Sequence, residues 1–144
     1  MQKLAILVTR LSSWVLSKMG RGGSMPGRLG IKIAPDCLNH LKFGGPVILV
    51  TGTNGKTSTA NMVSDLMEEA GYKVVTNRKG DNLRVGITST LLSHCSLSGR
   101  VKADAAVLEV DELNMKYIVP ALPVTAIVVN NFFRDQLDRA GEME

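Results

Sequence analysis

Apolar residues recur at helical spacing over residues 3–19, between polar and charged positions. They are Leu4, Ile6 or Leu7, Leu11, Trp14 or Val15, and Met19. This spacing predicts an amphipathic helix, and Arg10 interrupts the apolar run that a signal peptide would need. We expect its apolar face to pack on this domain or on a partner, and contact with a membrane surface stays open as the alternative.

A different pattern follows in residues 20–45. The stretch 20–30, GRGGSMPGRLG, contains five glycines and one proline, which predicts a loop. Residues 34–43, APDCLNHLKF, begin with Pro35-Asp36 after Ala34 and predict a short helix. We therefore expect residues 1–45 to form an N-terminal helical segment that precedes the main domain.

From residue 46 onward, apolar runs alternate with amphipathic stretches. The pattern predicts strands at residues 47–50, 73–76, 103–110 and 123–130, and helices at 56–70, 87–95 and 111–119. Gly71 stands where the residue after a helix end is expected. The alternation predicts an α/β fold with a P-loop-type, mostly parallel sheet flanked by helices. Because residues 131–144 begin an element without completing it, we expect the domain of residues 46–144 to be incomplete at its C-terminus.

The composition is that of a globular protein, with 44% hydrophobic and 21% charged residues. Its charge is uneven: residues 1–45 hold seven of the 17 Lys and Arg but one of the 13 Asp and Glu. This basic segment favours an anionic partner such as a nucleotide, a phosphorylated intermediate or an acidic lipid surface, and a solvated basic face without a partner is the alternative. Cys37 and Cys95 lack metal-ligand spacing, so we expect two inert thiols. No transmembrane segment is evident.

A candidate phosphate-binding loop lies in residues 46–63, PVILVTGTNGKTSTANMV. A strand, loop and helix start of this kind direct backbone N–H groups and the positive end of a helix dipole toward a phosphate. In such loops the lysine, here Lys56, reaches the terminal phosphates, and the Thr57 hydroxyl ligates Mg²⁺. The usual pattern has glycine where Val50 stands, so the loop is a variant. The candidate nucleotide-binding residues are Thr51, Gly52, Thr53, Asn54, Gly55, Lys56, Thr57 and Ser58.

Acidic residues follow the third predicted strand, in the stretch VLEVDE. Glu109 is the acid nearest the strand end, where open α/β sheets bind ligands, and we predict that it holds a Mg²⁺ bridging the β- and γ-phosphates of a nucleotide. Asp111 and Glu112 have a simpler interpretation as acids at a helix N-terminus. Lys56 and Glu109 are thus the candidate catalytic residues, and Thr57 and Glu109 the candidate metal ligands.

A third polar stretch, VNNFFRDQLDRAGE, follows the last predicted strand. Taken alone, its side chains are equally well explained as ordinary helix capping. Together, TGTNGKTST, LEV with Glu109, and NNFFRDQLDRAG resemble the central ATP-binding domain of the Mur ligase superfamily, which includes peptidoglycan amino-acid ligases and folylpolyglutamate synthase. The resemblance implies that Asn131 and Asp135 contact the nucleotide. Gln136 stands where relatives often have histidine, which puts a second metal ligand at that position in doubt.

Three stretches, GRGGSMPG, TNRKGDNLRVGI and VLEVDE with FFRDQLDR, resemble a branch of this family that lacks the large UDP-binding N-terminal domain. The branch implies ATP and Mg²⁺, a lipid II-type peptidoglycan precursor, a glutamine amidotransferase subunit that supplies ammonia, and no nucleic acid. It also implies a cytoplasmic protein, with the inner face of the membrane as an alternative place of action. Zinc is implied only for a part beyond residue 144, and Cys37 and Cys95 are not its ligands.

Three other functions remain open on the sequence alone. One is another Mur-type ligase, similar to folylpolyglutamate synthase. The second is a P-loop phosphotransferase or NTPase, although Val50 in place of glycine argues against it. The third is a truncated, non-catalytic module that binds a nucleotide or a partner. We expect that the 144-residue chain alone does not complete a ligase reaction.

Overall fold

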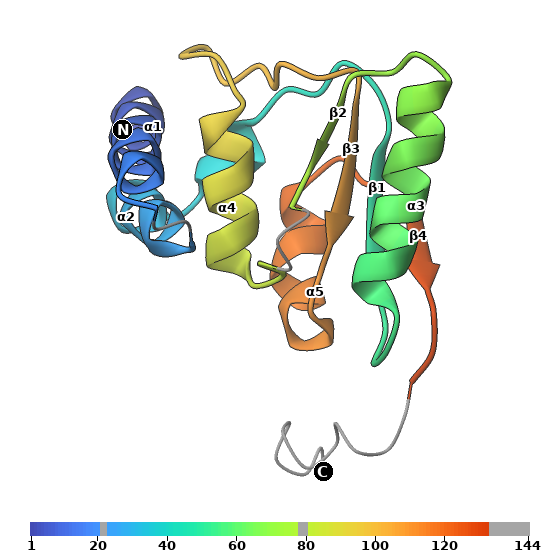
Figure 1. The fold of residues 1–144 in the computed structure, drawn as a ribbon. Coiled ribbons are helices and arrows are strands. Elements are labelled where there is room, and N and C mark those ends of the chain that lie inside the picture. The colour runs from blue at the N-terminus through green and yellow to red at the C-terminus, as the bar shows by residue number, and fades with distance from the viewer. Residues whose placement is uncertain (21–22, 78–80, 133–144) are drawn as a thin grey trace, which may run out of the picture.

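A four-stranded parallel sheet forms the centre of the molecule (Figure 1). The computed structural model describes residues 1–20, 23–77 and 81–132. Within these, the strands are β1 (Val47–Thr51), β2 (Val74–Thr76), β3 (Ala105–Glu109) and β4 (Ala126–Val129), in the order β2-β3-β1-β4. The predicted α/β class and parallel sheet are confirmed. Each strand lies within or within one residue of its predicted range.

Helices cover both faces of this sheet, as the alternation of apolar residues along the strands requires. Val50 and Val107 face α3 (Lys56–Glu69), where they contact Ala60, whereas Leu49 and Leu108 face the other side. The core on that side also contains residues of α1 (Gln2–Lys18), α4 (Arg84–Ser93), α5 (Met115–Ile118) and the segment after β3. The sheet is therefore sandwiched between α3 and the remaining helices (Figure 1).

Helix α3 agrees with its predicted span and ends before Gly71, whose φ of 90° suits a residue without a side chain. The predicted 87–95 helix begins three residues earlier, at Arg84. The predicted 111–119 helix is divided into the 3₁₀ turn Glu112–Asn114, α5, and the 3₁₀ turn Val119–Ala121. The predicted 34–43 helix is wrong for most of its length, because only Cys37–His40 forms a 3₁₀ turn.

The loop predicted for residues 20–30 is also wrong, because α2 (Met25–Ile33) occupies much of it. Pro26 lies in the first turn of this helix, a position that proline favours. Gly27 and Gly30 are buried where α2 meets α4 and α1. A Cβ on Gly27 would lie 1.8 Å from the Val85 carbonyl oxygen of α4. These glycines therefore permit close helix packing rather than a turn.

Helix α1 (Gln2–Lys18) confirms the predicted N-terminal helix but packs through an unexpected face. Ala5, Ile6 and Thr9 are its buried residues, and the Thr9 hydroxyl donates a hydrogen bond to the Pro26 carbonyl of α2. The apolar residues from which the packing face was predicted are, apart from Ile6, exposed: Leu4, Leu7, Leu11, Trp14, Val15 and Met19. The prediction that this face packs on the domain is therefore wrong for the described residues.

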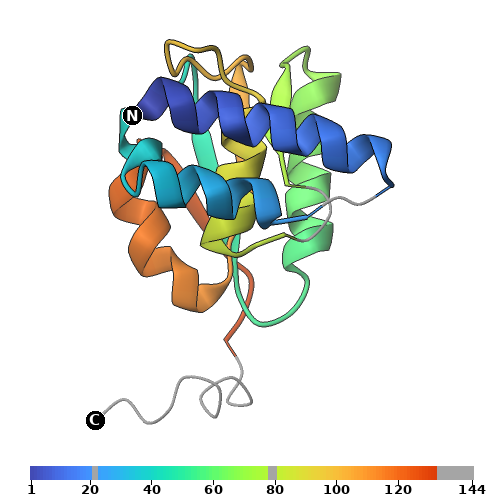
Figure 2. The ribbon, with the colours of Figure 1, turned by 90° about the vertical axis from the view of Figure 1, so that its left-hand side faces the viewer.

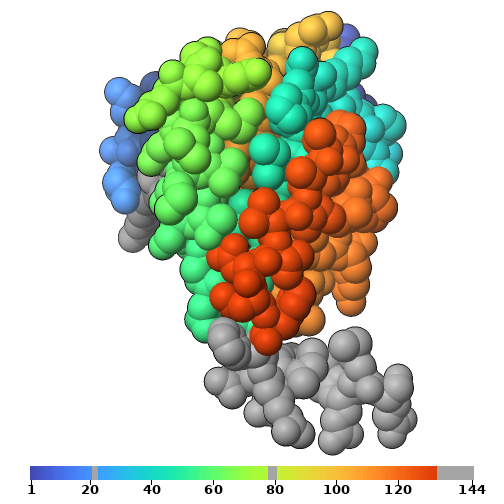
Figure 3. All heavy atoms as spheres, turned by 90° about the vertical axis from the view of Figure 1, so that its right-hand side faces the viewer, coloured from blue at the N-terminus to red at the C-terminus, as the bar shows by residue number. Residues whose placement is uncertain are grey.

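Figure 3 shows β4 at the surface of the molecule, beside α3. Ile127 and Val129 are about half exposed, whereas every residue of β3 is buried. β4 is the edge strand next to β1 and has no neighbour on its other side among the described residues. No described helix is long and apolar enough to cross a membrane.

Candidate functional site

The predicted phosphate loop lies at the carboxyl end of β1, between the ends of β3 and β4. Gly52 has φ 131° and Gly55 has φ 79°, conformations that L side chains rarely adopt. A Cβ on Gly52 would also lie 2.9 Å from the Asn131 carbonyl oxygen. Both glycines are thus required by backbone conformation, which explains this part of the motif.

Two asparagines after β4 hold the loop. The Thr53 amide donates to the Asn131 carbonyl at 2.8 Å, and the Asn54 amide donates to Asn131 Oδ1 at 2.9 Å. Asn131 Nδ2 and Asn130 Nδ2 both donate to the Asn54 carbonyl. The structure therefore brings the predicted residue Asn131 to the loop across 77 positions of sequence. Asp135 lies outside the described residues.

Lys56 begins α3 and is 9% exposed. Its ammonium donates to the carbonyl oxygens of Gly52 and Thr53 and forms an ion pair with Glu112 Oε1 at 3.2 Å. Glu112 Oε2 is buried and has no hydrogen-bond partner among the described residues. The Lys56 side chain thus folds back over its own loop, where Glu112 is its ion-pair partner.

The two predicted metal ligands are in direct contact. The Thr57 hydroxyl donates to Glu109 Oε2 at 2.8 Å, and Asn82 Nδ2 donates to Oε1 at 2.8 Å. The backbone of Glu109 is fixed by Asn77, whose side chain accepts from its N–H and donates to its C=O. Three side chains, from α3 and from the loop after β2, therefore position one buried residue, which is 4% exposed.

These residues fit a Mg²⁺ ion. The described residues contain no group of three or more His, Cys, Asp or Glu side chains that could hold a metal. Mg²⁺ needs no such group, because it is commonly bound through one or two protein ligands together with phosphates and water. The hydrogen-bond donors to the Glu109 carboxylate are a neutral hydroxyl and a neutral amide, and a buried carboxylate is best stabilised by a cation.

Sequence reasoning missed three contributors to this site, which are Asn77, Asn82 and Asn130. It named Glu112 as an acid at a helix start but not as the partner of Lys56. The predicted role of Asp111 in a helix start is confirmed, since its Oδ1 accepts from the Leu113 amide. Thr51 is buried and its hydroxyl has no hydrogen-bond partner among the described residues, whereas Ser58 is exposed. Asn77 and Asn82 flank a polar loop in the sequence, which was the available signal for them.

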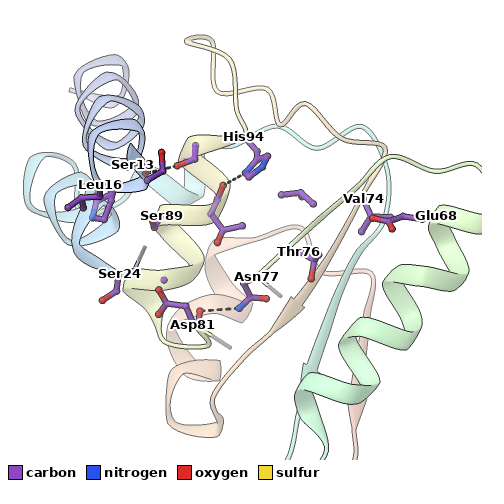
Figure 4. Close-up of a pocket in the computed structure, with 17 residues that line it drawn as sticks. Ser13, Leu16, Ser24, Glu68, Val74, Thr76, Asn77, Asp81, Ser89 and His94 are labelled. Carbon is purple, nitrogen blue, oxygen red and sulfur yellow. Dashed lines mark hydrogen bonds between the residues drawn. The ribbon is translucent and has the colours of Figure 1, made fainter. Parts of the chain in front are cut away.

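A separate hollow of about 980 Å³ lies between β2 and the helices α1, α2 and α4 (Figure 4). Its polar lining includes Ser13, Ser89, Thr76 and Asp81, but no lysine or arginine among the described residues. Burial raises the pKa of Asp81 above its usual value. The candidate nucleotide loop does not line it.

The two cysteines are buried and free. Burial raises the pKa of the Cys95 thiol to about 11 and also raises that of Cys37. Both groups are therefore neutral thiols at pH 7, and neutral thiols are poor nucleophiles and poor metal ligands.

The sequence of this domain matches a known family. Residues 50–144 match the family model described as "Mur ligase middle domain". The chain therefore belongs to the Mur ligase family, as the three motifs indicated.

Similar proteins indicate a branch within this family. The chain is 37% identical over 140 residues to the lipid II isoglutaminyl synthase (glutamine-hydrolyzing) subunit MurT of Streptococcus pneumoniae, covering 97% of this chain and 31% of that protein. For the same subunit of Staphylococcus aureus the identity is 31%, covering 99% and 32%. A UDP-N-acetylmuramoylalanine–D-glutamate ligase of Nitrobacter winogradskyi is 36% identical, covering 69% and 19%. The chain thus spans about a third of the length of the MurT relatives.

Proposed function

We propose that this chain is the ATP-binding part of a MurT-like ligase that amidates a carboxylate during peptidoglycan synthesis. The observation that carries the proposal is the contact of Thr57 with Glu109 beside Lys56, at the carboxyl edge of a parallel sheet. The similarity to MurT over nearly the whole chain supports it. The family's ligases in general support an ATP-dependent reaction.

Lys56 exchanges partners in this proposal. The ammonium of Lys56 pairs with Glu112, and the β- and γ-phosphates of ATP would replace that carboxylate as its anionic partner. Thr57 and Glu109 would hold Mg²⁺, which would neutralise charge on the phosphates. Asn131 accepts the hydrogen bonds of the Thr53 and Asn54 amides and so fixes the shape of the loop. The N–H groups at the start of α3 would then donate to the phosphates.

The proposed reaction has two steps. The γ-phosphoryl of ATP moves to the α-carboxylate of D-glutamate in the lipid II stem peptide, which gives ADP and an acyl phosphate. Ammonia from a GatD-like glutamine amidotransferase subunit then attacks the acyl carbon, and phosphate leaves as the amide forms. We place this reaction in the cytoplasm. The second step and the partner require the full-length protein.

The test is ATP binding by the 144-residue chain, measured by titration calorimetry with Mg²⁺ present. We expect Lys56→Ala to weaken binding by at least about tenfold, because a charged contact worth more than about 1.4 kcal/mol is removed. The matched control is Lys73→Ala, which removes an exposed lysine that precedes β2. Equal affinities of the two variants, or no binding by the unmodified chain, would contradict the proposed nucleotide site.

A second experiment concerns activity. We expect no ATP-dependent amidation of lipid II by the 144-residue chain alone, even with an amidotransferase present, because it spans about a third of its relatives. Amidation by the isolated chain would show that this expectation is wrong. ATP binding by full-length protein without amidation would instead support a non-catalytic nucleotide-binding role.

A further inference from the structure

The outward side of α1 and α2 carries a set of exposed apolar side chains. Figure 2 shows the two helices side by side across one side of the molecule. On α1 the exposed residues recur at intervals of three and four, with Leu11 64% and Trp14 60% exposed. We call the following set the outer face: Leu4, Leu7, Leu11, Trp14 and Val15 of α1, and Met25 and Leu29 of α2.

The two helices that carry the outer face are rich in basic side chains. Residues 1–35 contain six Lys and Arg and no Asp or Glu, and the first acidic residue is Asp36. Five of the six are described and exposed: Lys3, Arg10, Lys18, Arg28 and Lys32. The Lys18 ammonium lies 5.6 Å from the centre of the Trp14 ring. Apolar and cationic groups are thus presented together on one surface.

We propose that the outer face binds an anionic membrane surface. A helix that lies in the membrane interface presents Leu and Trp to the acyl boundary and Lys and Arg to the headgroups. The absence of acidic residues gives charge complementarity to anionic lipids, whereas a second copy of this face would bring like charges together. The inference goes beyond the proposed function, because it concerns where the chain works and not its chemistry.

The experiment uses vesicles of phosphatidylcholine with an equal share of phosphatidylglycerol. Trp14 is the only tryptophan of the chain and lies within the outer face, so its fluorescence reports contact directly. We expect a blue shift of its emission and co-sedimentation of the 144-residue chain with these vesicles at low salt. Both signals should weaken at high salt and with vesicles of phosphatidylcholine alone.

Two sets of variants separate the apolar and charged contributions. Leu7→Gln with Leu11→Gln, and separately Lys3→Gln with Arg10→Gln, are each expected to weaken vesicle binding by roughly tenfold. The matched control is Met62→Gln with Leu66→Gln on α3, where the two side chains are 63% and 61% exposed but lie outside the outer face. This control should bind vesicles as the unmodified chain does.

Three results would overturn the proposal. One is equal binding to neutral and anionic vesicles, and another is equal loss in the control and the outer-face variants. The third is a dimer in sedimentation velocity that Leu7→Gln with Leu11→Gln converts to a monomer, which would assign the face to a second copy. ATP titration of the same preparations tests the proposed function separately. The outer face lies on α1 and α2, whereas the candidate nucleotide site is formed by the loop after β1, the start of α3 and the end of β3.

Discussion

The glycines of α2 and those of the loop at residues 52–55 meet different physical demands. In α2 the backbone is helical, and Gly27 is needed because a neighbouring helix leaves no space for a Cβ. In the loop, Gly52 and Gly55 are needed because φ is positive. The two stretches look alike in sequence, and both were predicted to be loops. Glycine content alone therefore does not distinguish close helix packing from a turn.

The largest effect is expected at Gly27. Alanine there would place Cβ 1.8 Å from the Val85 carbonyl oxygen and 2.7 Å from the Ser89 amide nitrogen, and neither backbone atom can move without displacing α4. We expect Gly27→Ala to lower the free energy of unfolding by about 3 kcal/mol, despite the better helix propensity of alanine. Urea unfolding measures this. Gly44→Ala is the control, since its nearest neighbour would be 3.8 Å away.

The next largest effect is expected for Gly52→Ala. A residue with a side chain at φ 131° is strained, and the added Cβ would press on Asn131. We expect a loss of stability of about 1–2 kcal/mol together with weaker ATP binding, whereas Gly27→Ala loses stability alone. Thermal unfolding with and without Mg²⁺-ATP separates the two effects. Unchanged ATP affinity in Gly52→Ala would contradict the claim that the loop glycines serve nucleotide binding whereas those of α2 serve packing alone.

A smaller effect is expected at Gly30, where the Cβ would meet the Thr9 hydroxyl and a methyl of Leu92. Side-chain ends can rotate away, and alanine favours the helix, so we expect a net loss of about 1 kcal/mol. Combining Gly30→Ala with Thr9→Ala should cost less than the sum of the two single changes. Strict additivity in urea unfolding would show that Thr9 does not limit the space.

The smallest effect concerns Asp81, which lies against Gly86 of α4. Burial raises its pKa, so its protonated form favours folding, and that stability is lost as pH rises through the folded-state pKa. Asp81→Asn should therefore be slightly more stable than the unmodified chain at pH 7, with the difference vanishing below about pH 4. Asp36→Asn should change stability in the opposite direction, because the hydrogen bond from His40 lowers the Asp36 pKa. Thermal unfolding across pH measures both.

The sequence was sufficient for the α/β class and for the order of strands and helices from residue 46, because buried strands and amphipathic helices differ in period. It was also sufficient to select Thr57 and Glu109, which the structure places in contact. It was insufficient for α2 and for the outward direction of Leu11 and Trp14. Those depend on which neighbouring helix is present, and periodicity does not contain that information. The pairing of Lys56 with Glu112 depends equally on tertiary contacts.

The hydrogen bonds between Asn131 and the loop have a consequence for the order of events during synthesis. Asn54 and Asn131 are separated by 77 positions, so the loop cannot acquire these contacts until the chain has been made through residue 131 and β4 has paired with β1. The loop can therefore reach its final shape only after the last strand of the sheet has been synthesised. Nucleotide binding would then report that β4 has docked.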